Sequence, residues 1–88
     1  MINVKTQSGF EIAVDDEAMN SMELVDTLVE VDGNDLLAVS KLGEMLLGKD
    51  GKKKLYDHLR NNKGIVPVDL FMQELNEIMG ALGDSAKN

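Results

Sequence analysis

Apolar residues near the C-terminus recur in alternating steps of three and four, and this spacing constrains the segment to a helix. They are Val68, Phe71, Leu75, Ile78 and Leu82. The spacing is the one at which two helices pack along a seam. We therefore predict a helix over residues 67–82, with Pro67 in its first turn. Because the pattern covers only two heptads, packing into a core is favoured over a coiled coil.

The N-terminal residues predict a β-hairpin. Residues 2–6 and 10–14 alternate apolar and polar side chains, and Gln7-Ser8-Gly9 between them is typical of a turn. Because a pair of strands is only marginally stable in water, the apolar face of the hairpin must pack on helices.

Three more helices are expected between the hairpin and the last helix, over residues 17–31, 35–47 and 52–61. Asp15 or Asp16 is expected to cap the first of them, and Gly48 to end the second. The first carries two neighbouring apolar stripes, formed by Ala18, Met22, Val25 and Val29 and by Leu24, Leu28 and Val31. An apolar arc of this width predicts that two neighbouring elements cover it.

The predicted fold class is α+β and mostly helical, with an N-terminal β-hairpin packed on about four short α-helices. A chain of 88 residues is one domain, here expected over residues 1–82 and followed by a flexible polar tail, 83–88. The chain has no Cys and no Trp, so Leu, Val, Ile and Met must form its core. Residues expected to be buried are Ile12, Leu28, Leu46, Leu59, Leu75 and Ile78.

The net charge of −7 is unevenly distributed along the chain. Residues 1–40 carry nine acids and one base, whereas residues 41–63 carry seven bases and three acids. A predominantly acidic chain is repelled by phosphate backbones, so no nucleic acid partner is expected. The N-terminus lacks the basic start and apolar run of a signal peptide, and no apolar stretch approaches the roughly 20 residues of a membrane span. We therefore expect a cytosolic protein without a membrane partner.

The motifs that suggest chemistry are incomplete. Residues 43–50 match the first seven positions of a phosphate-binding loop, but Asp50 stands where a hydroxyl should bind magnesium. Residues 32–35 resemble the start of a calcium loop, but Leu37 occupies the position that requires glycine. His58 has no Cys or second His with which to bind a metal. We expect no catalytic residue, no metal and no cofactor.

Several segments, in order and spacing, resemble the short tail assembly chaperones of long-tailed phages (siphophages) of Gram-positive bacteria. The segments are Phe10-Glu11-Ile12 with Val14-Asp15, Met45-Leu46-Leu47-Gly48, Lys54-Leu55-Tyr56-Asp57-His58-Leu59-Arg60, Gly64-Ile65-Val66-Pro67 and the terminal Lys87-Asn88. The resemblance spans nearly the whole chain.

The resemblance implies a non-catalytic protein that binds and solubilises the phage tape measure protein before the tail tube polymerises. It also implies a longer, frameshifted form that recruits the tail tube protein. The expected location is the host bacterial cytoplasm, and the protein is not expected in the mature virion. An alternative is an acidic regulator or inhibitor that mimics DNA and binds a basic partner, since residues 11–35 contain nine acids and no base. An enzyme is a more distant alternative, because no nucleophile–base pair is visible.

Two sets of residues are candidates for protein contacts. The partner-binding set is the apolar seam of the last helix, namely Met72, Leu75, Ile78, Met79 and Leu82. A homo-oligomer is also expected, because a protein that coats a long rod is needed in many copies. In it, Glu23, Asp26 and Glu30 of one copy would face Lys52, Lys53 and Arg60 of the next. Pairing of the same charges within one molecule is an equal alternative.

Overall fold

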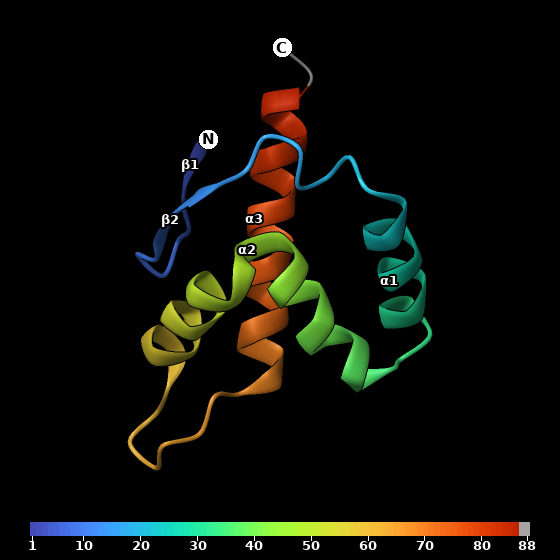
Figure 1. The fold of residues 1–88 in the computed structure, drawn as a ribbon. Helices are drawn as coiled ribbons and strands as arrows, with labels where there is room; N and C mark the ends of the chain where they lie inside the picture. Colours follow the sequence, from blue (N-terminus) through green and yellow to red (C-terminus); the bar gives the residue numbers. More distant parts are fainter. Residues whose placement is uncertain (87–88) are drawn as a thin grey trace.

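The structure is a computed structural model that describes the backbone of residues 1–86 and the side chains of residues 1–83. Its elements are β1 (Ile2–Lys5), β2 (Glu11–Val14), α1 (Met22–Asp32), α2 (Leu36–Leu59) and α3 (Val68–Ala86). In Figure 1, α3 runs through the middle of the molecule, with α2 across it, the hairpin on one side and α1 on the other. The α+β class is confirmed.

The predicted hairpin is present, and its two strands are antiparallel. Ile2 pairs with Val14 and Val4 pairs with Ile12, and the turn is closed by the Gly9 N–H donating to the Thr6 carbonyl over 3.0 Å. Gly9 has φ +91°, which a residue without a Cβ adopts at no steric cost. The buried side chains of the hairpin are Val4, Thr6, Phe10 and Val14.

Over the residues that it describes, the structure has three helices where about four were predicted. The expected helices over 35–47 and 52–61 are two arms of α2, which bends at Gly48, where φ is 74° and ψ is 172°. This conformation is essentially restricted to glycine, so Gly48 breaks the helical path as expected. The two arms fold into a V that lies against α3 (Figure 1). The last helix continues to Ala86, beyond its predicted end at residue 82. Residues 87 and 88 of the predicted tail lie outside the described residues.

The start of the first helix was predicted wrongly. Helix α1 begins at Met22, and its N-cap is Ser21, whose hydroxyl accepts from the Leu24 N–H over 3.3 Å. Asp15 instead accepts from the Glu17 N–H in a turn, and Asp16 lies 2.8 Å from the amino group of Met1. Both acids have good capping chemistry, but the chain between β2 and α1 uses them in turns.

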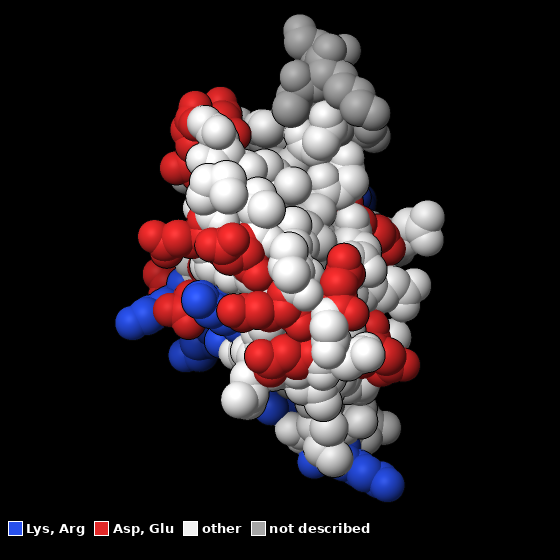
Figure 2. Space-filling view, turned by 90° about the vertical axis from the view of Figure 1, so that its right-hand side faces the viewer, with Lys and Arg blue, Asp and Glu red and all other residues white. Residues whose placement is uncertain are grey.

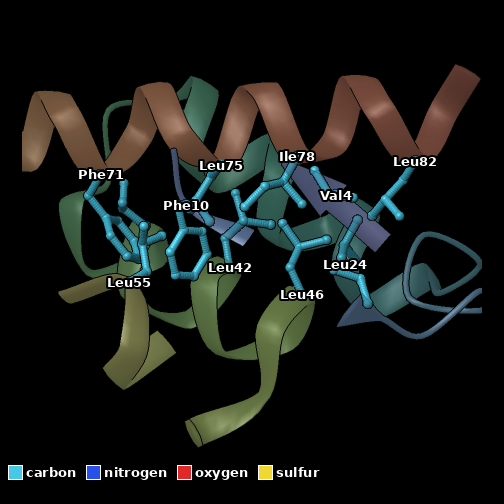
Figure 3. Packing of buried hydrophobic residues seen from close by; sticks show 12 residues of the cluster. Val4, Phe10, Leu24, Leu42, Leu46, Leu55, Phe71, Leu75, Ile78 and Leu82 are labelled. Carbon is cyan, nitrogen blue, oxygen red and sulfur yellow. The ribbon is translucent and has the colours of Figure 1, made fainter. Parts of the chain in front are cut away.

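The core lies between α3 and the other elements (Figure 3). Phe71, Leu75, Ile78 and Leu82 project from α3 toward Leu42, Leu46 and Leu55 of α2, Leu24 of α1 and Val4 and Phe10 of the hairpin. Of the residues expected to be buried, Leu46, Leu75 and Ile78 are buried, whereas Ile12, Leu28 and Leu59 are only partly buried at the edge of this core.

Close packing between α2 and α3 depends on a residue without a side chain. A Cβ built on Gly43 would lie 2.6 Å from Cζ of Phe71, so this glycine makes room for the aromatic ring. The ring also meets Tyr56 edge-on at a centroid distance of 5.2 Å, a favourable aromatic geometry. Phe71 therefore joins both arms of α2 to α3.

We predict opposite effects on stability for alanine at two glycines. A Cβ added at Gly48 or at Gly80 would have no neighbouring atom within 4 Å, so steric crowding is absent at both positions. Gly48→Ala should lower the free energy of unfolding by about 1–3 kcal/mol, because its backbone conformation is strained for alanine. Gly80→Ala, inside α3, should raise it by about 0.5–1 kcal/mol through helix propensity. Urea denaturation of both variants measures the difference, and equal shifts would contradict the role given to Gly48.

Candidate functional site

The candidate partner-binding residues of α3 divide into buried and partly exposed members. Leu75, Ile78 and Leu82 are 1%, 0% and 3% exposed and belong to the core. They are therefore not available to a partner in this fold, which corrects the expected partner surface. Met72 and Met79 pack on the edge of the core and keep part of their side chains at the surface. At helical spacing they share one side of α3 with Val68, which is 51% exposed. We call Val68, Met72 and Met79 the methionine flank.

Helix α1 has an apolar side that the other residues described by the structure leave uncovered. Its inner side, with Leu24 and Thr27 buried, packs on α2. On its outer side Met22, Val25 and Val29 are 70%, 43% and 67% exposed. The sequence predicted two neighbouring elements for the wide apolar arc of this helix, and among the residues that the structure describes only α2 has its backbone close to α1. We call these three residues the α1 ridge.

The acidic candidates lie beside the α1 ridge. With about 100° of rotation per residue, Asp26, Glu30 and Glu23 occupy the helix arc next to that of the ridge. All three are exposed, and we call them the acidic row. Figure 2 views this side of the molecule and shows acidic side chains with uncharged surface between them, while basic side chains gather toward one edge and the lower end.

Of the basic candidates, Lys52 and Lys53 lie on the second arm of α2, and Arg60 is the C-cap residue that follows it. The Nζ of Lys52 donates to Ser40 Oγ over 2.7 Å, lies 3.9 Å from Glu44 and sits 5.5 Å from the centre of the Tyr56 ring. Arg60 lies 3.8 Å from Asp57 and donates to the Gly64 carbonyl over 2.8 Å. Lys53 is exposed.

The acidic row and the basic candidates do not pair within one molecule. Over the side chains that the structure describes, no ion pair joins the row to Lys52, Lys53 or Arg60. The intramolecular alternative is therefore not what this fold forms, and both sets remain candidates for contacts between molecules.

An apolar pocket opens where both arms of α2 meet the start of α3. It is lined chiefly by Leu36, Val39, Tyr56, Val66, Val68 and Phe71 and has a volume of about 300 Å³. Leu36 and Val68 on its wall are 66% and 51% exposed. A second depression shares Tyr56 with it and is lined by Glu44, Lys49, Lys52 and Lys53. We call these two features the α2–α3 pocket and the basic depression. The sequence did not predict the α2–α3 pocket, because its walls come from segments up to 35 residues apart, whereas Lys52 and Lys53 of the basic depression were among the predicted candidates.

A polar network connects the hairpin turn to the helices. Glu74 is 4% exposed, and its Oε1 accepts hydrogen bonds from Thr6 Oγ1 over 2.7 Å and from Ser8 Oγ over 2.8 Å. Ser8 Oγ also lies 3.0 Å from His58 Nε2, and the Gln7 N–H donates to Glu77 over 2.9 Å. No sequence pattern indicated this network, because its members are 50 to 70 residues apart.

The direction of the hydrogen bonds explains what this network does. Ser8 has one hydroxyl proton and donates it to Glu74, so its contact with His58 requires an N–H donated by the imidazole. In a serine nucleophile the histidine must instead accept the serine proton. The arrangement therefore holds Ser8 in the turn, and the His58 ring supports it by packing on Phe10 at a centroid distance of 5.4 Å.

Three further observations concern the N-terminal amino group, metal binding and membrane crossing. The Asp16 carboxylate raises the pKa of the Met1 amino group through a hydrogen bond and its charge. Among the residues that the structure describes, no three His, Cys, Asp or Glu side chains gather as a metal site would require. Over the same part of the chain, no helix combines the length and the apolar character needed to cross a membrane.

Comparisons of this chain with protein-family models, with curated proteins and with solved structures found no match. The α1 ridge, the α2–α3 pocket and the methionine flank are surfaces of the kind through which proteins bind proteins.

Proposed function

We propose that this chain is a non-catalytic phage tail assembly chaperone that binds the tape measure protein and keeps it soluble until the tail tube polymerises. The observation that carries the proposal is the amount of apolar helical surface that the fold leaves uncovered, on α1 and around the start of α3. In a small domain, surfaces of this kind are typical of protein-binding sites. The resemblance to tail assembly chaperones supplies the identity of the partner.

The methionine flank is the surface that we assign to the tape measure protein. Methionine side chains are flexible and polarizable, so they adapt to partner surfaces of varied shape. A long rod-like partner presents many different apolar segments, and an adaptable surface can bind them in turn. Met72 and Met79 are the two members of the predicted partner-binding set that keep surface exposure. The chaperone would act in the host cytoplasm, and a longer frameshifted form would add the contact with the tail tube protein.

Co-purification tests this assignment. A tagged chain is co-expressed with the tape measure protein encoded beside it, and the amount of tape measure protein retained per chain is measured. Met72→Lys with Met79→Lys should reduce retention at least about tenfold, because two charges would be buried in the contact. The matched control is Leu70→Lys with Gln73→Lys, which adds the same charge at exposed positions of α3 that lie about 100° or more around the helix from Met72 and Met79. If both variants retained equal amounts of tape measure protein and had unchanged circular dichroism, the methionine flank would not be the site that binds the tape measure protein.

A second candidate function is supported by the acidic row. Glu23, Asp26 and Glu30 form a line of exposed negative charge that could imitate a phosphate backbone toward a basic DNA-binding protein. Capture of such a protein at low salt, lost at high salt and after reversal of the three charges, would favour this inhibitor function over the chaperone.

A further inference from the structure

A cleft opens between the end of the hairpin, the turn that follows it and the bend of α2. In Figure 1 the chain between β2 and α1 runs above this bend. The cleft has a volume of about 340 Å³, and we call it the bend cleft. Its walls are mostly apolar, with Val14 and Ala18 from the hairpin and the turn and with Leu46 and Leu47 from α2. It therefore offers a recess to an apolar group of a ligand.

The turn gives the bend cleft a negatively charged rim. Asp15 and Glu17 line the cleft, and among the described residues of its lining none is Lys or Arg. Asp15 Oδ1 accepts from the Glu17 N–H and Glu17 Oε2 accepts from Asn20 Nδ2, both over 2.9 Å, so the two carboxylates are held in place. An ionised carboxylate accepts several hydrogen bonds, so each has capacity for a further donor. The neighbouring Asp16 already binds a cation, the amino group of Met1, over 2.8 Å.

The first arm of α2 adds to the negative potential of the cleft. This arm begins at Leu36 and leaves the helical path at Gly48, where φ is 74° and ψ is 172°. The C-terminal end of a helix carries about half a negative elementary charge, and the last residues of this arm, 45–47, line the cleft. The bend cleft therefore combines apolar walls with negative charge from two separate sources, the acidic turn and the end of a helix.

A ligand that matches this cleft has an apolar stem that ends in a positive charge. Lysine and arginine side chains are built in this way, because their methylene stems pack on apolar surface while the charged head stays near water. We propose that the bend cleft binds a lysine or arginine side chain of a partner protein, together with an apolar residue next to it in the partner. The stem packs on Val14 and Leu47, and the charged head meets Asp15 and Glu17. The cleft shares no residue with the methionine flank, so this contact does not depend on the identity of the protein that the chain chaperones.

Titration of the isotope-labelled chain with short peptides, followed by NMR, tests this assignment. Three peptides differ only in a central residue between two leucines, which is lysine, norleucine or glutamate. Norleucine keeps the alkyl stem of lysine and lacks its charge. The lysine peptide should shift the backbone amides of residues 13–18 and 45–48 in a saturable way. At low salt it should bind about three- to tenfold more tightly than the norleucine peptide, and the glutamate peptide should bind most weakly.

Neutral variants of the rim separate the charge from the shape of the cleft. Asp15→Asn with Glu17→Gln removes both charges and keeps the turn, because the amide oxygens still accept the hydrogen bonds from the N–H of residue 17 and from Asn20. This variant should bind the lysine and norleucine peptides with equal affinity. The matched control is Asp57→Asn with Asp69→Asn, which makes the same change in net charge at exposed residues that do not line the cleft. The control should change the affinity for the lysine peptide by less than about twofold.

Free arginine amide distinguishes a protein contact from a site for small cations. It carries the charged head and stem without apolar neighbours, so it should bind much more weakly than the lysine peptide. The proposal is overturned if the lysine peptide causes no saturable shifts at the cleft up to millimolar concentration, or if it binds no more tightly than the norleucine peptide. It is also overturned if the control variant loses the preference for lysine as fully as the rim variant does, or if arginine amide produces the same shifts at the same concentrations.

Discussion

Leu75→Ala is expected to lower the free energy of unfolding by about 2–5 kcal/mol. Leu75 is 1% exposed and lies in the middle of the row that α3 presents to the core (Figure 3). Removing its terminal atoms leaves a cavity between α3 and α2 that packed neighbours fill only in part. A domain of this size has a total stability of only about 5–15 kcal/mol, so the loss is a large fraction of it.

Leu37→Ala is the matched control for this substitution. Leu37 is also a helical leucine, but it is 84% exposed. Its replacement should change stability by no more than about 0.5 kcal/mol. Urea denaturation gives both values if the m-value is unchanged, since the midpoint then reports stability alone. Similar losses for the two leucines would show that α3 does not pack as described.

Glu74→Ala is expected to lower the free energy of unfolding by about 2–3 kcal/mol, because two hydrogen bonds to a charged group are lost and the buried hydroxyl of Thr6 is left without this acceptor. Thr6 is only 5% exposed, so solvent replaces Glu74 as its acceptor less well than at an exposed site. The substitution should also loosen the hairpin turn, since Thr6 and Ser8 both donate to the same carboxylate oxygen. Amide hydrogen exchange of residues 6–10 measures this loosening.

Glu77→Ala provides the comparison from the next turn of the same helix. Glu77 accepts from the Gln7 N–H in an exposed contact, where water can replace the carboxylate. Its loss should cost no more than about 1 kcal/mol. If both glutamates had the same effect on stability and on exchange, the buried network would not be what holds the hairpin to α3.

The parts of the fold that are determined by residues close together in the sequence were predictable. Alternation over residues 2–6 and 10–14 predicted the hairpin and its buried face, and the spacing of apolar residues predicted α3. Gly48 was expected to end a helix, and the backbone does leave the helical path there. Helix α1 was placed too early because Asp15, Asp16 and Ser21 are all good capping residues, and the sequence does not show which one the chain uses.

The candidate surfaces were less predictable, because burial depends on contacts between distant segments. Helices α1 and α3 both carry apolar stripes, but the sequence does not show which stripe meets another element. In the structure Leu75 and Ile78 of α3 are buried, while Met22 and Val29 of α1 are exposed. The predicted partner surface on α3 is therefore mostly core, whereas one apolar side of α1 is exposed. No pattern in the sequence around Glu74 indicated its hydrogen-bond network.

The central claim is that this chain keeps a tape measure protein soluble, and co-expression tests it most directly. Fragments of the tape measure protein encoded beside this chain are expressed alone and together with it, and the soluble fraction of each fragment is measured. The proposed function predicts that fragments which aggregate alone remain soluble with the chain and elute with it in gel filtration. If every fragment stays equally insoluble with and without the chain, the proposed function is wrong.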